Sequence, residues 1–504
     1  MGRLAGFAVS HWGEDPWARG SWSLIGRDGS PADRVALGAP IGGRLVIAGE
    51  ATHPTRAGMT HGAYEQGVLA AAWAADLGHD RIAVVGAGMA GLAAGRALTE
   101  RGVDVVIWEA RDRIGGRTAP AEIDGAGFDL GANWLQQYDD NILARLAESL
   151  SLRTVPTDFD NPLILDGSPR PANAETEAMA RASAEAKAGA DAEPKADAEA
   201  KAGAEAKAGA EAKAGAEAKA GAEAKAGAEA KAEARAKAGA GREAKAGAEA
   251  GAEAEVAVWA GEAIEAELRD RLAAAPDGGS VAEVIEAWTG GLGDEEAEAV
   301  RRFVDAEIMM DSGAPLSWLS ARHGFEPGVG EGDRWIAGGY RLVTEHLAAG
   351  LAVRLRHPVR RIVVDPDGVT LSGDAGSVRA GAVIVTAPLG VLAGGGIEFE
   401  PPLPEPHRAA LGRLGMGRVE KVVLRFGERF WPAHPAGYYR VHGPATGCIS
   451  EWLDATDADG VPTLVGLFAG PWLDELWTGS DEEIAARAAA VFARAAGRAP
   501  EHSG

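Results

Sequence analysis

A glycine-rich turn between an apolar strand and a helix constrains this chain more than any other feature. It lies in the stretch RIAVVGAGMAGLAAGRALTERGVDVVIWEA, where Gly86, Gly88 and Gly91 form a G-x-G-x-x-G pattern. In such a turn the first glycine permits a tight bend, the second lets the backbone approach a pyrophosphate, and the third allows close packing of helix on strand. Glu109 ends the second strand, 18 positions after Gly91, where an acid accepts ribose hydroxyls. The pattern predicts a dinucleotide-binding β-α-β unit and an α/β fold.

Composition and charge exclude several classes of protein. The chain has 504 residues, enough for two or more domains or lobes, and 46% of them are hydrophobic. A formal net charge of -24 argues against nucleic acid or an anionic membrane as a partner and favours a cationic small molecule. Cys448 is the one cysteine, so no intrachain disulfide can form and a reducing cytoplasm is expected. We expect no signal peptide, no membrane span and no metal site.

A low-complexity segment interrupts the chain. Residues 184–254 repeat Ala-Glu-Ala-Lys-Ala-Gly with a period of six, which does not match the helical 3.6, so no apolar face can form. We expect a fraying helix or a solvated linker there. Near the N-terminus, strand 44–48, helix 60–77 and strand 82–85 read as a β-α-β unit whose helix leads into a neighbouring parallel strand.

Two further motifs follow the glycine turn. ARDRIGGRT bends the backbone at Gly116, where Arg113 and Arg117 can reach phosphate or isoalloxazine carbonyls, and FDLGANWL comes next. Together with the glycine turn, these motifs resemble the flavin-containing amine oxidase family, which includes polyamine oxidases, monoamine oxidases and lysine-specific histone demethylases. The later stretches TAPLGVL, FEPPLP and LGMGRVEKVVLRFGERFW resemble the same family.

The resemblance covers nearly the whole chain outside the repeat, but in a different order. HWGEDPWARGSWS and LVIAGEATHPTRAGMTHGAYEQG resemble the flavin-binding tail that closes the chain in the family and opens it here. No motif is duplicated or missing. We therefore expect a circular permutation in which residues 1–77 complete the FAD site of their own chain, with Met1 and Gly504 as surface neighbours. Fusion between broken gene copies would give the same order.

The resemblance implies a Rossmann-like FAD-binding lobe and a mixed α+β substrate lobe, with the C-terminal helix counted in the FAD-binding lobe. The expected segments are a permuted FAD-binding tail (1–77), the dinucleotide-binding βαβ segment (78–150), a first part of the substrate lobe (151–183), the low-complexity linker (184–254), a helical part of the substrate lobe (255–334), a continuation of the FAD-binding lobe (335–400), a β segment of the substrate lobe (401–475) and the C-terminal helix (476–504).

The resemblance also assigns roles to individual positions. Lys421 matches the family lysine that holds a water at flavin N5, the alternative being a solvated lysine on an edge strand. Ser21 stands where monoamine oxidases have their flavin-linking cysteine, so FAD should be non-covalent. Tyr340 and Trp431 are candidates for a substrate channel or for the core. The expected substrate contacts are Trp22, Met59 and Trp134. The expected cofactor contacts are Gly49, Glu50, Met59, Thr60, Gly86, Gly88, Met89, Ala90, Gly91, Glu109, Arg111, Arg113, Gly116, Arg117, Asn133, Trp134 and Val359.

The reaction implied by the resemblance is FAD-dependent oxidation of the C–N bond of a primary or secondary amine or polyamine. The imine hydrolyses, and dioxygen is reduced to hydrogen peroxide. Three alternatives stay open. One is an L-amino-acid oxidase, with Arg322 and Arg341 as candidates to bind the substrate carboxylate. Another is a carotenoid-type desaturase or other FAD-dependent oxidoreductase, and the third is a non-catalytic flavin-binding or scaffold protein. The residues leave the oligomeric state open.

Overall fold

A five-stranded parallel sheet carries the glycine turn. The computed structural model of the protein describes residues 4–165, 249–326, 332–443 and 447–497. In sheet order the strands are β12 (Val353–Arg354), β5 (Asp104–Trp108), β4 (Arg81–Val85), β16 (Ala382–Val385) and β3 (Leu45–Ile47). Every adjacent pair is parallel, and helix α3 (Met89–Glu100) joins β4 to β5. The predicted α/β fold and the β-α-β unit at the glycine turn are confirmed.

The strand next to β3 in this sheet differs from the prediction. Strand β3, helix α2 (Thr60–Asp76) and β4 form a parallel β-α-β unit, and Gly78 follows the helix with a φ of +70°. However, β3 and β4 are not adjacent, because β16 lies between them. A helix about 10 Å wide covers roughly two strand spacings of about 4.8 Å, so its crossover can pass over one strand. The inserted strand comes from late in the chain, where a local pattern cannot place it.

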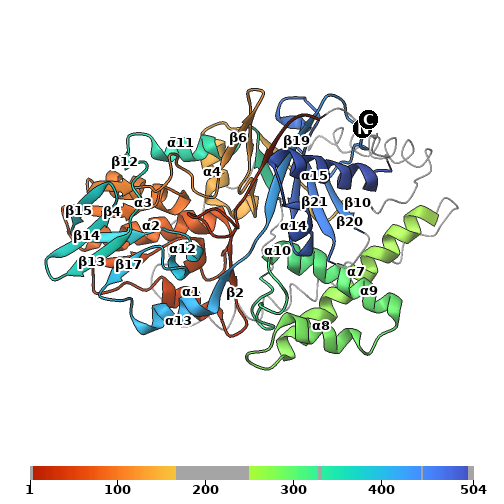
Figure 1. The fold of residues 1–504 in the computed structure, drawn as a ribbon, viewed down its shortest axis with the longest axis horizontal. Helices are drawn as coiled ribbons and strands as arrows, with labels where there is room; N and C mark the ends of the chain where they lie inside the picture. Colours follow the sequence, from red (N-terminus) through yellow and green to blue (C-terminus); the bar gives the residue numbers. More distant parts are fainter. Residues whose placement is uncertain (1–3, 166–248, 327–331, 444–446, 498–504) are drawn as a thin grey trace, which may run out of the picture. The chain divides into compact units, whose positions relative to one another are not determined.

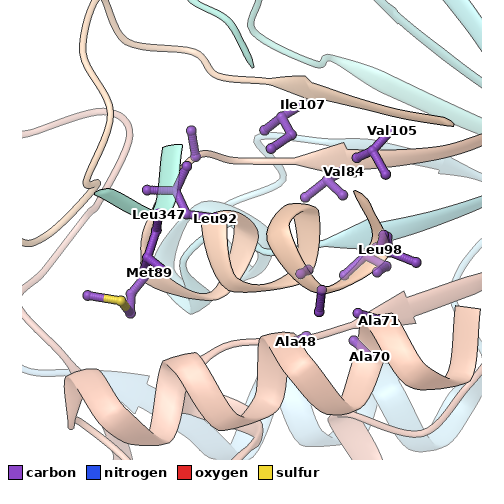
Figure 2. Close-up of a cluster of buried hydrophobic side chains, with 14 of the residues drawn as sticks. Ala48, Ala70, Ala71, Val84, Met89, Leu92, Leu98, Val105, Ile107 and Leu347 are labelled. Carbon is purple, nitrogen blue, oxygen red and sulfur yellow. The ribbon is translucent and has the colours of Figure 1, made fainter. Parts of the chain in front are cut away.

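Helices cover one face of the parallel sheet. Figure 2 shows Val84, Val105 and Ile107 on the strands facing α3, while Ala70 and Ala71 of α2 approach α3 from its other side. Helices α4 (Ile142–Ser149) and α11 (Arg341–Ala348) complete this layer. The small alanine side chains let the two helices lie close together.

A second sheet covers the opposite face. Its order is β15 (Gly376–Ala380), β14 (Gly368–Gly373), β13 (Arg361–Asp365) and β17 (Glu398–Glu400). The cluster between the two sheets also takes side chains from helices α1 (Pro31–Leu37), α12 (Leu389–Ala393) and α13 (Glu405–Arg413). The parallel sheet is therefore buried on both faces, as its apolar strands require.

A separate six-stranded sheet has the order β1 (Leu4–Val9), β19 (Glu420–Phe426), β22 (Thr463–Phe468), β21 (Ile449–Asp454), β20 (Tyr438–His442) and β10 (Leu163–Leu165). Helix α15 (Asp481–Ala495) lies on this sheet (Figure 1). Its Phe492 is buried in the cluster between the helix and the sheet. The C-terminal helix, which was expected to belong to the FAD-binding lobe, therefore packs on the six-stranded sheet and not on the parallel sheet that carries the glycine turn. Its apolar face, on Ile484, Ala488 and Phe492, matches the aromatic surface of the six-stranded sheet instead.

Helices dominate residues 249–312. They are α7 (Glu249–Ala274), α8 (Val281–Thr289), α9 (Asp294–Val304), the π-helical turn η3 (Asp305–Met309) and α10 (Met310–Ser312). Helix α8 begins with the capping box that the sequence suggests, between Ser280 and Glu283. Helix α7 begins inside the segment 184–254, so the helical region starts earlier than its predicted boundary at residue 255.

The other described elements are short. They are β2 (Ser23–Ile25), η1 (Glu50–Thr52), β6 (Pro120–Ile123), β7 (Ala126–Asp129), β8 (Trp134–Leu135), η2 (Tyr138–Asp140), β9 (Thr154–Pro156), β11 (Arg334–Ile336), β18 (Leu414–Met416), η4 (Thr456–Ala458) and α14 (Pro471–Leu476). None of the described helices combines the length and the apolarity needed to cross a bilayer.

Most of the repeat, residues 184–248, lies outside the described residues, as do Met1 and Gly504. Deleting 184–248 spares helix α7 and should raise the free energy of unfolding by about 1 kcal/mol. For the solvated linker that the sequence predicts, each halving of its length lowers the closure cost by about 0.6 kcal/mol, and this deletion amounts to about two halvings. Denaturant unfolding of the two proteins measures the difference. A loss of several kcal/mol would show that the repeat packs against the fold.

Candidate functional site

The glycine turn is built so that only glycine fits at two of its positions. Gly86 has a φ of +99°, and its N–H donates to the carbonyl of Trp108 at 2.8 Å. A Cβ added to Gly91 would lie 2.0 Å from the Gly86 carbonyl oxygen. Thr386, which follows β16, supports the turn because its hydroxyl donates to the carbonyls of Val85 and Gly86. The roles predicted for Gly86 and Gly91, a tight bend and close packing, match this geometry.

Gly88 is glycine for a different reason. It is the N-cap of α3, and a Cβ placed on it would meet only the Cα of Gly116, at 3.9 Å. Gly116 in turn has a φ of +56°. The two backbones therefore leave open space in front of the helix N-terminus, whose first N–H groups have no partner within the helix. Met89 and Ala90 form the first residues of this helix, and both are buried.

Glu109 and three arginines surround the turn. The Glu109 carboxylate accepts hydrogen bonds from the backbone N–H groups of Ala87 at 2.6 Å and Arg111 at 2.8 Å. Arg111 forms an ion pair with Asp15 at 2.6 Å, which ties the N-terminal segment to this edge. Arg113 donates to the Gly116 carbonyl at 2.9 Å, and burial, together with the neighbouring Arg111, lowers its pKa. A carboxylate has about four acceptor positions, so Glu109 keeps capacity for a ligand hydroxyl.

Val359 lies in the segment that follows β12 and bonds to Glu109. It is buried in the same cluster as Trp108, the residue before Glu109. The intervening loop is fixed because the backbone N–H of His357 donates to the Glu109 carbonyl at 2.8 Å. Val359 follows His357 by two residues, so this bond holds it near the carboxyl end of β5.

Glu50 is the centre of a buried polar network. It follows Gly49, whose φ is +147°. One carboxylate oxygen accepts from the Ser23 hydroxyl at 2.6 Å and from the Gly58 N–H at 2.8 Å, and the other accepts from Arg117 at 2.9 Å. A pocket beside it is lined by Gly49, Glu50, Arg117, Thr386, Ala387 and Pro388, among others. The tail segment and the residues that follow β16 therefore border one hollow at the carboxyl ends of β3 and β16, and Thr386, which supports the glycine turn, is among them.

The network holds Glu50 ionised. Burial alone would raise its pKa, but Arg117, the Ser23 hydroxyl, Arg34 and the Gly58 N–H together hold the pKa below its ordinary value of 4.5. Arg34 is fully buried behind Ser23 and also pairs with Glu326 at 2.6 Å. An anion buried among two guanidinium groups contributes to stability only while it is charged.

Glu50→Gln should lower the free energy of unfolding by about 3 kcal/mol, because losing one partner leaves buried cations uncompensated. A depressed pKa gives stability that is complete above the unfolded pKa, near 4.5, and is lost as pH falls through the lower folded pKa. The wild-type advantage should therefore shrink below about pH 4.5. Denaturant titrations across pH measure it, with Glu267→Gln on an exposed helical pair as the control. A pH-independent difference would contradict this charge role.

Tyr340 links the start of α2 to the FDLGANWL motif. Its hydroxyl bonds to Thr60 at 2.7 Å and donates to the Trp134 carbonyl at 2.9 Å. Its backbone N–H donates to Asp129 at 3.0 Å. Tyr340 is fully buried, and Trp431 packs among phenylalanines of the six-stranded sheet, so both take core positions. Thr60 and its neighbour Met59, the buried N-cap of α2, are thereby held at a fixed distance from Trp134.

Lys421 is the buried cation of the site. It is 6% exposed and lies on β19, between β1 and β22, so the reading as a solvated edge-strand lysine is wrong. Its ammonium donates to the carbonyl of Gly131 and to the side-chain oxygen of Asn133. It also lies 5.3 Å from the centroid of the Trp134 ring. Burial lowers its pKa, an effect opposed by Asp129.

Two tryptophans face one apolar cluster next to this lysine. Trp22 and Trp134 both pack on a cluster that includes Met309, Met310 and Val419. The Trp22 indole donates to the Asp311 carbonyl at 2.8 Å, and its ring lies beside Gly58, which precedes Met59. The three predicted substrate residues, Trp22, Met59 and Trp134, are thus brought to one region.

Several residues of the site were not identified from the sequence. Ser23, Arg34, Asp129 and Thr386 hold Glu50, Lys421 and the glycine turn through buried contacts. Ser23, Asp129 and Thr386 stand inside motifs quoted above, and this position could have pointed to them. The arginines offered for an amino-acid carboxylate have other partners, Asp277 for Arg322 and Glu345 for Arg341. Within the described ranges, no group of three or more potential ligands could hold a metal ion.

A parallel sheet with a glycine turn and an acid at the end of the next strand is the arrangement of a dinucleotide-binding protein. The family model described as flavin containing amine oxidoreductase matches residues 3–74 and 89–503. The chain belongs to this family. It is an FAD-dependent oxidoreductase that acts on amines, with FAD bound non-covalently. In keeping with this, the Ser21 hydroxyl is engaged with the Gly417 carbonyl at 3.0 Å.

Relatives agree with the family assignment. Polyamine oxidase 4 of Oryza sativa subsp. japonica is 27% identical over 404 residues, covering 80% of this chain and 70% of its own. A structure of wild-type putrescine oxidase bound to putrescine aligns with a TM-score of 0.54 and 21% identity, covering 83% of this chain and 82% of that one. Cyclohexylamine oxidase from Brevibacterium oxydans IH-35A aligns with a TM-score of 0.53, 21% identity and the same coverage. At this identity, the structural likenesses show the fold.

Proposed function

We propose that this chain oxidises the C–N bond of a primary or secondary amine, including polyamines, to an imine that water hydrolyses, while dioxygen is reduced to hydrogen peroxide. The observation that carries the proposal is the buried ammonium of Lys421, held by Gly131 and Asn133 beside the Trp134 ring. Polyamine, putrescine and cyclohexylamine oxidases among the relatives support the substrate class.

The residues present fit FAD. Open space in front of Gly88 suits a pyrophosphate at the N-terminus of α3, and the free acceptor capacity of Glu109 suits ribose hydroxyls. Bound FAD supplies the two-electron chemistry. We propose that the groups holding it are Gly49, Glu50, Met59, Thr60, Gly86, Gly88, Met89, Ala90, Gly91, Glu109, Arg111, Arg113, Gly116, Arg117, Asn133, Trp134 and Val359.

The protein's own groups would then prepare the amine and a water. Trp22, Met59 and Trp134 exclude bulk water and contact the substrate by dispersion and ring-face attraction. Since a protonated amine cannot release a hydride equivalent, a dry aromatic site also favours the neutral amine. The Lys421 ammonium has three N–H groups, and the one that is left after the bonds to Gly131 and Asn133 can hold a water.

We further propose that the chain order is a circular permutation of the family order. Its support is that the first strand, β1, pairs with β19, while α15 packs against β1 and the Trp477 indole donates to the Ser10 carbonyl at 2.8 Å. The family model also matches the first 74 residues as a separate block. In this proposal residues 1–77 supply Glu50 and the start of α2 to the FAD site.

We also propose a division of the chain into two lobes, a cationic substrate and a reducing compartment. The parallel sheet with its covering layers would form the FAD-binding lobe, and the six-stranded sheet with helices α7–α10 the substrate lobe. The net charge of -24 favours a small cationic amine over nucleic acid, and the lone Cys448 suits a reducing cytoplasm.

A peroxide assay tests the function. Purified protein is offered putrescine, spermidine, benzylamine, cyclohexylamine and L-leucine under air. Peroxide from one or more of the four amines, and little from leucine, is expected. Peroxide from leucine alone would favour the amino-acid oxidase, and no peroxide from a protein that retains FAD would favour a non-catalytic flavoprotein.

A further inference from the structure

The use of lysine in this chain singles out position 421. All other lysines lie between residues 187 and 245, in the repeat, and every other basic position outside it is arginine or histidine. Arginine stays charged at any ordinary pH, whereas a buried lysine shifts its pKa readily. Lys421 is therefore the one strongly basic side chain outside the repeat whose charge the surroundings can set.

A buried carboxylate lies on the segment that binds this lysine. Asp129 is 6% exposed and precedes Gly131 and Asn133, the two acceptors of the Lys421 ammonium. Both of its oxygens accept from the Tyr340 N–H, at 3.0 and 3.1 Å. Gly339 leaves room for it, since a Cβ there would lie 2.9 Å from the carboxylate.

Few other charges act on these two groups. The charge of Asp129 raises the pKa of Lys421. The charges of Lys421 and of the half-exposed Arg341 lower the pKa of Asp129. Glu420, next to Lys421 on β19, is directed to the Ser10 hydroxyl and to the N–H groups of Trp12 and Gly13. Burial lowers the pKa of Lys421 and raises that of Asp129, and each group opposes the shift of the other. Each of the two buried groups thus favours the charged form of the other.

We propose that Asp129 is a positioning residue that keeps Lys421 protonated, so that its ammonium can hold a water in the amine-oxidation site. The importance of this role for catalysis rests on the proposed function. The electrostatic interaction between Asp129 and Lys421, called the pairing below, does not rest on it. Without the Asp129 charge, a buried ammonium would give up its proton at lower pH, and the neutral amine would donate more weakly to Gly131 and Asn133.

Asp129→Asn tests the pairing. The amide keeps the shape and an oxygen for the Tyr340 N–H but removes the charge. Wild-type and variant holoenzyme carry lysine labelled with ¹³C at Cε, and the Lys421 signal, assigned by its loss in Lys421→Met, is titrated by NMR. We expect its midpoint to fall by about one pH unit or more in Asp129→Asn, the scale of a nearby opposite charge. The rate of flavin reduction by an active amine should show the same displacement in its pH profile.

Asp305→Asn is the matched control, because Asp305 is also a buried carboxylate that accepts a backbone N–H, from Gly447. It should leave the Lys421 midpoint in place. An unchanged midpoint in Asp129→Asn, or equal displacement in both variants, would overturn the pairing. If Asp129→Asn does not fold, the infrared band of a protonated carboxyl provides the reciprocal test. The band should appear in Lys421→Met at a pH where wild type lacks it, and its absence there would overturn the pairing. A displaced midpoint in a protein that oxidises no amine would leave the pairing intact and reject the proposed function.

Discussion

Gly88→Val is expected to give a folded protein that purifies without FAD. A Cβ at this position meets only the Gly116 Cα, at 3.9 Å, so the protein itself has room for the new side chain. The methyl groups would instead fill the space before the N-terminus of α3, where a pyrophosphate must approach the backbone. Flavin per chain should fall at least about tenfold, which corresponds to about 1.4 kcal/mol or more of binding free energy. Visible absorbance gives the flavin content and circular dichroism gives the fold.

Gly91→Val provides the contrast within the same turn. There a Cβ would lie 2.0 Å from the Gly86 carbonyl oxygen and 2.9 Å from the Thr386 hydroxyl, so the helix must move off the strand. This variant should lose thermal stability as well as flavin. Wild-type FAD content in Gly88→Val would place the cofactor elsewhere and reject the proposed role of the turn.

Lys421→Met should retain FAD and react about a hundredfold more slowly in flavin reduction by amine, in reoxidation by dioxygen, or in both. Most of the groups proposed to anchor the dinucleotide lie at the glycine turn and around Glu50, and of the proposed FAD contacts Asn133 and Trp134 touch this side chain. Methionine is of similar length, so little packing is lost, but the acceptors at Gly131 and Asn133 lose their ammonium donor. Removing a positioned group that holds or moves a proton costs roughly 10²-fold or more in rate. Stopped-flow absorbance measures both half-reactions.

Arg425→Met is the control for charge loss on the same strand. Arg425 is another buried cation of β19, but it pairs with Asp459 at 2.8 Å and stacks on Phe128. Its variant should be less stable and yet keep both rates per bound flavin. Wild-type rates in Lys421→Met would remove this lysine from the chemistry.

Local structure could be predicted from the sequence where the residues that determine it lie within one short stretch. The turn at Gly86–Gly91, the glycine after α2 and the capping box of α8 each depend on residues within a few positions of one another. The family motifs added residues from distant parts of the chain, and the structure places Glu50 beside Arg117 and Lys421 beside Asn133. Their roles toward FAD remain proposals.

Long-range packing could not be read in the same way. Nothing near β3 or β4 signals that β16 inserts between them, because the contact joins residues some 300 positions apart. The C-terminal helix was grouped with the FAD-binding lobe, yet it packs on the six-stranded sheet, because an apolar stripe does not specify its partner. Arg34 reads as an ordinary surface arginine, yet it is fully buried because Ser23, Ala51 and Glu326 converge on it. Such networks exist only once the sheets are assembled.

Anaerobic mixing of the purified wild-type protein with an amine tests the central claim most directly. Using the panel amine that gives most peroxide, the visible flavin absorbance should bleach once, with one aldehyde or ketone released per flavin. Admitting dioxygen should restore the absorbance and yield one peroxide per flavin. Flavin that stays oxidised with all four amines, or that only L-leucine bleaches, would contradict the assignment of an amine-oxidising site.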